Sequence, residues 1–191
     1  LRERVGIAAA AFETKAGRVQ RPSSIKVWDP LVRIFHWFLV AGMAYEMLAE
    51  AGTDTHELVG YGLLGLIAFR VIWGFIGTKY ALFSDFVASP LTTLAYLKDI
   101  FIGHPKRYIG HNPAGAAMVL LLLLAVVGTA GTGWAMTTDV LWGEEWIEEL
   151  HEAAAYGMIV LIAGHVIGVI VASVQHRENL VRAMITGRKQ A

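Results

Sequence analysis

Four apolar stretches, each about 20 residues long, dominate this chain and restrict the folds open to it. They occupy residues 30–49, 56–77, 114–136 and 151–174, with boundaries uncertain by a few residues. A helix needs about 20 apolar residues to cross a bilayer, and only helices or closed barrels can satisfy their backbone there. Hydrophobic residues make up 55% of the chain, and its mean hydropathy is +0.51. We therefore predict an all-α integral membrane protein, a bundle of four transmembrane helices.

Local signals predict where several helices begin. Pro30 suits the first turn of the first span, because its missing N–H has no partner there anyway. The segment Asp54–Glu57 has the spacing of a capping box for the second span, and Asn112 before Pro113 predicts the start of the third. Residues 90–102 have the apolar spacing of a short amphipathic helix. We interpret it as an ordered connector; the alternative is that it lies on the inner membrane surface.

The distribution of basic residues predicts the orientation. The loops 50–55 and 137–150 contain no Lys or Arg, and the second holds Asp139, Glu144, Glu145, Glu148 and Glu149. Since Lys and Arg gather in cytoplasmic loops, we expect both termini and the loop 78–113 to be cytoplasmic. Trp134, Trp142 and Trp146 fit an outer aromatic belt, and Trp28 and Trp73 an inner one.

This topology divides the chain into three parts. Residues 1–26 contain Arg2, Arg4, Lys15, Arg18 and Arg21, and we expect them to form a cytoplasmic arm. Residues 27–175 form the membrane domain, and residues 176–191 a cytoplasmic tail. The chain has no cysteine, which excludes disulfides, iron–sulfur clusters and covalent haem attachment through Cys-x-x-Cys-His. Any haem must be bound non-covalently, as in b-type cytochromes.

The histidines carry the strongest functional signal. His165 is the only ionisable side chain in the apolar run 159–171, and an ionisable group at that depth predicts a functional site. His151 lies fourteen residues earlier, which on a helix is about 21 Å away and within roughly 40° of the same face. The predicted topology puts His56 level with His151 near the outer leaflet, and His36 level with His165 near the inner one.

Two level pairs of imidazoles favour two bis-histidine haems. Two axial imidazoles leave no vacancy on the iron, so such a pair of haems would relay electrons across the bilayer. The alternatives are an interfacial role for His56 and His151 and proton relay through His165; zinc is a poor alternative, because the pairs lie too far apart for one tetrahedral site. The glycines beside the histidines would admit haem, but taken alone they favour tight helix packing; these are Gly42, Gly60, Gly62, Gly157, Gly164 and Gly168.

Several segments resemble the bacterial cytochrome b561 family, a group that includes the b-type subunit of membrane-bound nickel–iron hydrogenases. The resembling segments are 27–37, 56–62 with Arg70, 111–115 leading to 131–134, and 150–152 followed by Gly164 and His165. The resemblance covers about residues 26–175. It implies a four-helix di-haem b cytochrome of the bacterial inner membrane that exchanges electrons with quinone. The family's haem ligands correspond to His36, His56, His151 and His165.

Other polar residues have weaker assignments. Arg33 and Arg70 fall near the inner haem, where they would pair with haem propionates; a role as inner-side anchors is about equally favoured. We expect His111 at the inner interface, at the start of the third span or as a quinone-side contact rather than an iron ligand. His104 and His176 are most simply solvated.

The favoured function is electron transfer between the quinone pool and a redox partner, with a periplasmic c-type cytochrome as the expected partner of the acidic loop 137–150. One alternative is a cytochrome b subunit that anchors a hydrogenase or other dehydrogenase and reduces quinone. Another is a superoxide:quinone oxidoreductase that acts without a partner. A bundle that conducts protons or is purely structural would contain no haem. We expect contacts with membrane lipid, a possible homodimer, and no nucleic-acid partner.

Overall fold

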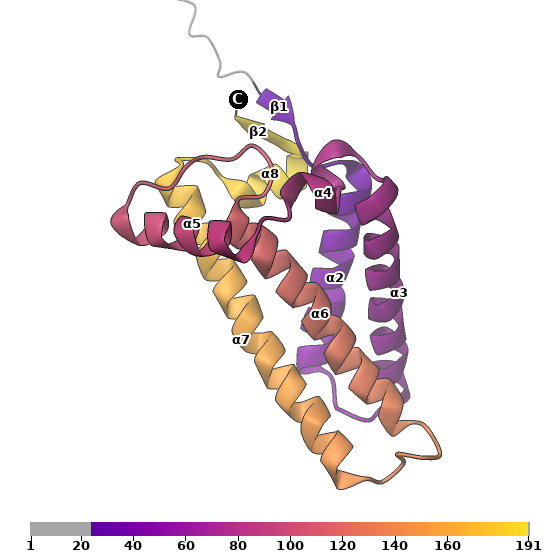
Figure 1. Cartoon of the computed structure of the whole chain (residues 1–191). Coiled ribbons are helices and arrows are strands. Elements are labelled where there is room, and N and C mark those ends of the chain that lie inside the picture. Colours follow the sequence, from indigo (N-terminus) through magenta and orange to yellow (C-terminus); the bar gives the residue numbers. More distant parts are fainter. Residues whose placement is uncertain (1–23, 191) are drawn as a thin grey trace, which may run out of the picture.

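The computed structural model describes residues 24–190, so nearly all of the predicted N-terminal arm lies outside the described residues. Within that range, four helices are long and apolar enough to cross a membrane, and they run alongside one another (Figure 1). They are α2 (Pro30–Leu48), α3 (Asp54–Ile76), α6 (Pro113–Met136) and α7 (Glu145–Gln175). The prediction of an all-α membrane bundle with four spans is confirmed.

The remaining elements gather at one end of the bundle (Figure 1). They are β1 (Ser24–Lys26), η1 (Lys79–Ala81), α4 (Phe83–Phe86), α5 (Pro90–Ile102), α8 (Leu180–Thr186) and β2 (Arg188–Gln190). We call this the capped end. The loops α2–α3 and α6–α7 lie at the opposite end, which we call the hairpin end. The short helix expected at 90–102 is present as α5, begun by Ser89, whose hydroxyl accepts from the Thr92 N–H.

The helix starts follow the predicted capping signals with one exception. Asp29 accepts from the Val32 N–H at 3.0 Å ahead of Pro30, and Asn112 accepts from the Gly115 N–H at 2.7 Å ahead of Pro113. The start of α3 differs, because Thr53 rather than Asp54 is the cap and accepts from the His56 N–H at 3.3 Å. Thr53 has the extended backbone that a cap requires, which leaves Asp54 in the first turn, where its charge favours the helix dipole.

Helix α7 begins at Glu145, six residues before the expected start of the span at 151. Hydropathy marks the part of a helix that suits lipid and does not mark where the helix begins. Glu145 and Glu148 lie in the first turn, where negative charge stabilises a helix. At 31 residues, α7 is about 46 Å long and exceeds the hydrocarbon core of about 30 Å. The acidic segment 137–150 is therefore a loop up to residue 144 and helix from Glu145 onward.

The four long helices pack in sequence order: α2 against α3, α3 against α6, and α6 against α7. Their shared core consists of Phe35, Leu63, Ile67, Leu123, Val126 and Met158. Gly42 supports this packing, because a Cβ there would lie 2.8 Å from Leu63 Cδ2. In contrast, a Cβ at Gly60, Gly62, Gly157 or Gly168 would meet no atom within 4 Å. The packing explanation therefore holds for Gly42 and does not account for these four.

The segment predicted as a simple C-terminal tail is folded. Strand β2 pairs antiparallel with β1, with Ser24 opposite Gln190, and α8 packs its Ala183 against Val27 and Trp28. Glu178, only 6% exposed, accepts from the Gln190 N–H and lies 3.6 Å from Lys189 Nζ and 3.7 Å from Arg107 Nη2. These contacts join segments far apart in the sequence, so neither the hydropathy nor the charge pattern revealed them. We call β1, α8 and β2 the cap.

Candidate functional site

His56 and His151 face each other at the hairpin end. His56 lies in the first turn of α3 and His151 in the second turn of α7. Their ring centroids are 6.3 Å apart, and the ring planes are nearly perpendicular at 81°. Thus the structure brings together the two histidines that the sequence placed at the same depth. They lie on α3 and α7, which both pack against α6. We call them the hairpin-end pair.

The two rings of the hairpin-end pair both have polar groups beside Nδ1. His151 Nδ1 lies 2.9 Å from the Thr129 carbonyl oxygen and 3.1 Å from Thr132 Oγ1. His56 Nδ1 lies 2.5 Å from Glu46 Oε2, although the angle falls outside ordinary hydrogen-bond geometry. Room for the His151 ring depends on Gly133, where a Cβ would lie 3.1 Å from His151 Cε1.

This arrangement fits bis-histidine ligation of one haem iron. With a polar group beside each Nδ1 atom, the Nε2 atom of each ring is left as the ligand atom, and such second contacts orient metal-binding imidazoles. Imidazole nitrogens bind metals at about 2 Å, so two rings that share one metal have centroids about 6 Å apart. The observed 6.3 Å agrees. A Cβ at Gly60, one turn after His56, would meet no atom within 4 Å.

His36 and His165 are the second pair of candidate ligands, which we call the cap-end pair. His36 lies in the second turn of α2, and His165 lies on α7, fourteen residues beyond His151. Both residues are half-buried. The Nδ1 atoms of His36 and His56 are both buried without a hydrogen bond among the described residues. They differ because His56 has a carboxylate beside it.

His111 directly precedes Asn112, the cap of α6, and lies inside the capped end; its expected place at the inner membrane interface stays a prediction. Its ring packs between Trp28 and Phe86, with centroid distances of 4.7 and 4.5 Å and tilted ring planes. Burial, helped by the charges of Arg70, Lys189 and His165, lowers the pKa of His111 to about 3. The imidazole is therefore neutral across the physiological range. Of the other two histidines, His104 is exposed and His176 is partly exposed at the end of α7.

The two arginines predicted near the inner haem have different surroundings. Arg70 is 3% exposed, donates to the Ala81 carbonyl at 3.0 Å and lies 5.0 Å from the centroid of Phe83. Its Nη1 atom is buried without a hydrogen-bond partner among the described residues. A buried guanidinium with an unused donor suits an anion such as a haem propionate. The propionate role of Arg70 stays a prediction.

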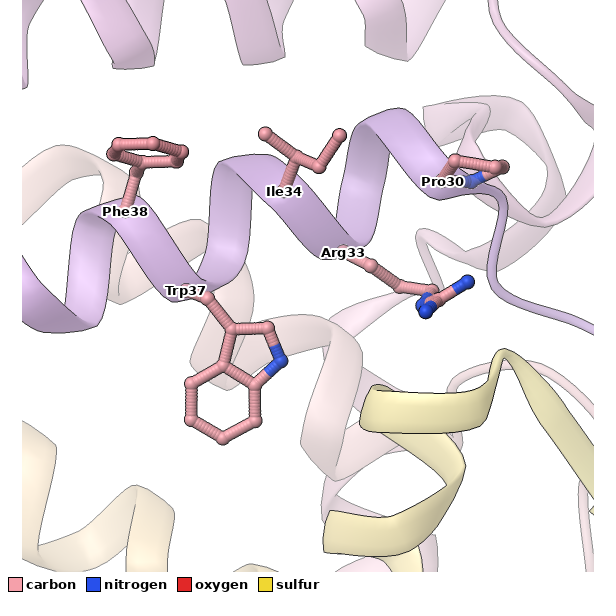
Figure 2. A pocket seen from close by; sticks show the side chains of 5 residues that line it. All are labelled: Pro30, Arg33, Ile34, Trp37 and Phe38. Carbon is pink, nitrogen blue, oxygen red and sulfur yellow. The ribbon is translucent and has the colours of Figure 1, made fainter.

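Arg33 is used by the cap. Its Nε donates to the Met184 carbonyl at 3.3 Å, and its Nη2 donates to the Ile185 carbonyl. Cations at a helix C-terminus satisfy its last carbonyls, so Arg33 ties α2 to α8. Figure 2 shows Arg33 in a shallow hollow of about 270 Å³ together with Pro30, Ile34, Trp37 and Phe38. All five residues belong to α2, so the hollow is a surface feature of one helix.

Sequence reasoning missed the residues that hold the hairpin-end pair. Thr129 and Thr132 lie within a strongly apolar span and give little signal of their own. Glu46 did offer one, because it is the only acidic residue in 30–49. An acidic side chain in a membrane span predicts a partner nearby. That partner is His56, across the α2–α3 loop.

Comparison with known proteins agrees with this architecture. The family model for prokaryotic cytochrome b561 matches residues 27–187. The "Probable Ni/Fe-hydrogenase B-type cytochrome subunit" of Rhodobacter capsulatus is 24% identical, covering 90% of this chain and 83% of the relative. The protein of the same name from Azotobacter vinelandii is also 24% identical, covering 93% and 94%. No solved structure matches the chain at a significant level. Because the family model covers most of the described chain, the protein belongs to the prokaryotic cytochrome b561 family.

Proposed function

We propose that this protein carries electrons across the bacterial inner membrane through two bis-histidine b haems, between the quinone pool and a redox partner protein. The observation that carries the proposal is the hairpin-end pair: two imidazoles 6.3 Å apart, each with a polar group beside its Nδ1 atom. Membership of a b-type cytochrome family supplies the haem. The cap-end pair is the second ligand set.

The residues divide the work of holding and orienting the cofactors. His56 and His151 would hold one haem, with Thr129, Thr132 and Glu46 orienting these imidazoles. His36 and His165 would hold the other. When bound, haem would supply reversible one-electron chemistry. The spacing of fourteen positions from His151 to His165 separates the two ligand sets by about 21 Å along α7, so one helix would link the two haems across most of the bilayer.

Charge supports the proposed topology and the side where the partner binds. The hairpin end has no Lys or Arg in either loop, and its loops and helix ends carry many carboxylates. Trp142 and Trp146 are 75% and 54% exposed there. We infer that this end is periplasmic and docks a partner protein, while the capped end and both termini are cytoplasmic. An acidic surface with exposed aromatic residues suits a partner with a basic contact surface.

Two partners fit this surface. The names of the relatives favour a hydrogenase, of which this chain would be the b-type cytochrome subunit passing electrons to quinone. The acidic surface favours a soluble c-type cytochrome. Purification from the native membrane under mild detergent separates them, because a hydrogenase subunit co-purifies in fixed ratio. A superoxide:quinone oxidoreductase would instead turn over superoxide as the isolated chain.

The haem-to-protein ratio tests the central proposal. A pyridine haemochromogen assay with a reduced-minus-oxidised spectrum should give two b haems per chain, both low-spin. One haem would show that one of the two pairs does not bind, and none would contradict electron transfer altogether. Reduction of both haems by a quinol then tests the exchange with the quinone pool.

A further inference from the structure

Glu46 is a carboxylate placed inside a membrane span. It lies in the last turn of α2, and its side chain is only 12% exposed. Oε2 lies 2.5 Å from His56 Nδ1, which makes the two groups a close charge contact, while Oε1 and His56 Nδ1 are both buried without a hydrogen bond among the described residues. Burying a carboxylate is costly unless it is paired. The imidazole of His56 is therefore the group that this carboxylate is placed to meet.

Within residues 24–190, no Lys or Arg forms an ion pair with Glu46. The chain has no Lys or Arg between Arg33 and Arg70, and none between Arg107 and Arg177. The other charged side chains of the hairpin end, in both loops and the adjoining helix turns, are carboxylates. An ordinary surface ion pair therefore does not explain Glu46. The remaining candidate partner is the His56 ring, which would gain positive charge when it binds the haem iron.

The two rings of the hairpin-end pair have different acceptors at Nδ1. His151 meets the neutral carbonyl oxygen of Thr129 and the Thr132 hydroxyl. His56 meets a carboxylate. An anionic acceptor draws the Nδ1 proton away from the ring and makes the opposite nitrogen a stronger electron donor to a bound metal. The two axial ligands of one iron would thus differ in strength.

We propose that Glu46 is a positioning residue that orients His56 and lowers the midpoint potential of the haem bound by the hairpin-end pair. The inference rests on the proposed function, because it needs His56 to be an iron ligand. A stronger donor stabilises ferric iron, which carries more positive charge than ferrous iron. With Glu46 in place, this haem would be harder to reduce than the same haem in a protein without the carboxylate.

Potentiometric titration of the purified full chain with both haems bound tests this role. Glu46→Gln keeps the shape and the capacity to accept from Nδ1 but removes the charge. We expect the midpoint potential of the hairpin-end haem to rise by about 59 mV, a tenfold change in the equilibrium constant of a one-electron couple. The potential of the other haem should stay the same. The low-spin electron paramagnetic resonance signal of the hairpin-end haem should also shift, since it reports the strength of the axial ligands.

Glu50→Gln is the matched control, because Glu50 is exposed at the same end of the bundle. This substitution removes the same charge. Equal shifts in both variants, or no shift in Glu46→Gln, would overturn the proposal. If Glu46→Gln loses the haem, Glu46→Asp decides the question. Binding of the haem in Glu46→Asp supports an orienting role for the carboxylate. Loss of the haem in both variants would overturn the proposal that Glu46 adjusts its midpoint potential. Fewer than two haems in the wild-type protein would instead contradict the proposed function.

Discussion

The hairpin-end pair and the cap-end pair have the same residue type at both positions but different surroundings. At the hairpin end, both imidazoles have a contact at Nδ1, from Thr129 and Thr132 on α6 and from Glu46 on α2. At the capped end, the His36 Nδ1 atom has no hydrogen bond among the described residues, as is also true of His56, and it has no carboxylate beside it among them. The nearby polar groups there are Arg70 and His111, both packed among aromatic rings.

The difference shows two ways of preparing a cofactor site. At the hairpin end, protein groups lie beside both rings, and their 6.3 Å separation is that expected of a ligand pair. The capped end instead holds the buried cation Arg70, whose Nη1 has no hydrogen bond among the described residues; we propose that a haem propionate meets it. We expect the first site to tolerate loss of any one supporting contact and the second to depend on Arg70.

Removing one ligand from each pair is the strongest way to break the comparison. His151→Ala and His165→Ala should each reduce the haem content from two per chain to one, because a bis-histidine iron loses an axial ligand. The two variants should lose haems of different midpoint potential. Haemochromogen assay and redox titration measure both effects, with His104→Ala, an exposed histidine, as the control. Loss of the same haem in both variants would show that the pairing is wrong.

Arg70 and Arg33 sharpen the comparison at the capped end. Arg70→Gln removes a buried cation, and we expect retention of the cap-end haem to fall by roughly tenfold. Arg33→Gln removes contacts with α8 carbonyls and should leave both haems in place while making the cap easier to digest with protease. Haem content after dialysis separates the two effects. Equal haem loss in both variants would assign both arginines to haem binding.

Glu178 tests whether the cap is held independently of the haems. Glu178→Gln leaves the buried Lys189 without its carboxylate partner, although its Nζ still donates to the Tyr108 carbonyl. Breaking a buried ion pair costs about 3 kcal/mol. Hydrogen exchange at β2 should become faster, with the haem spectrum unchanged. Glu149→Gln, an exposed carboxylate, should change stability by less than about 0.5 kcal/mol. A changed haem spectrum in Glu178→Gln would mean that the cap also shapes the cofactor site.

His111 should make the stability of the capped end depend on pH. Its pKa is about 3 in the folded protein against an ordinary 6.5, so below 6.5 the unfolded chain takes up a proton that the folded chain refuses. Stability is therefore complete above pH 6.5 and decreases towards pH 3, by at most about 1.4 kcal/mol per pH unit. Thermal unfolding of the detergent-solubilised protein between pH 7 and pH 5 should show this slope. In His111→Asn the slope should become smaller, and His104→Asn should keep it.

The sequence by itself determined the class of fold and the outline of the site. Hydropathy over about 20 residues located four spans, since a bilayer demands that length whatever the helices pack against. Asp29, Asn112 and Ser89 began their helices because capping acts within three residues. The spacing of His56 and His151 along their spans predicted their common depth, and the structure brings their rings together. The pairing of His36 with His165 rests on the same depth argument and stays a prediction.

Tertiary structure decided which side chains support those histidines and how the chain ends are used. Contacts of His151 with Thr129, of Arg33 with α8, and of β1 with β2 join residues 22 to about 160 positions apart. Such contacts depend on how each helix is rotated about its axis and on which neighbour it packs against. Hydropathy and periodicity describe one segment at a time and contain neither quantity. The sequence shows the acidic residue Glu46 within a span, but only the packing of α2 against α3 identifies His56 as its partner.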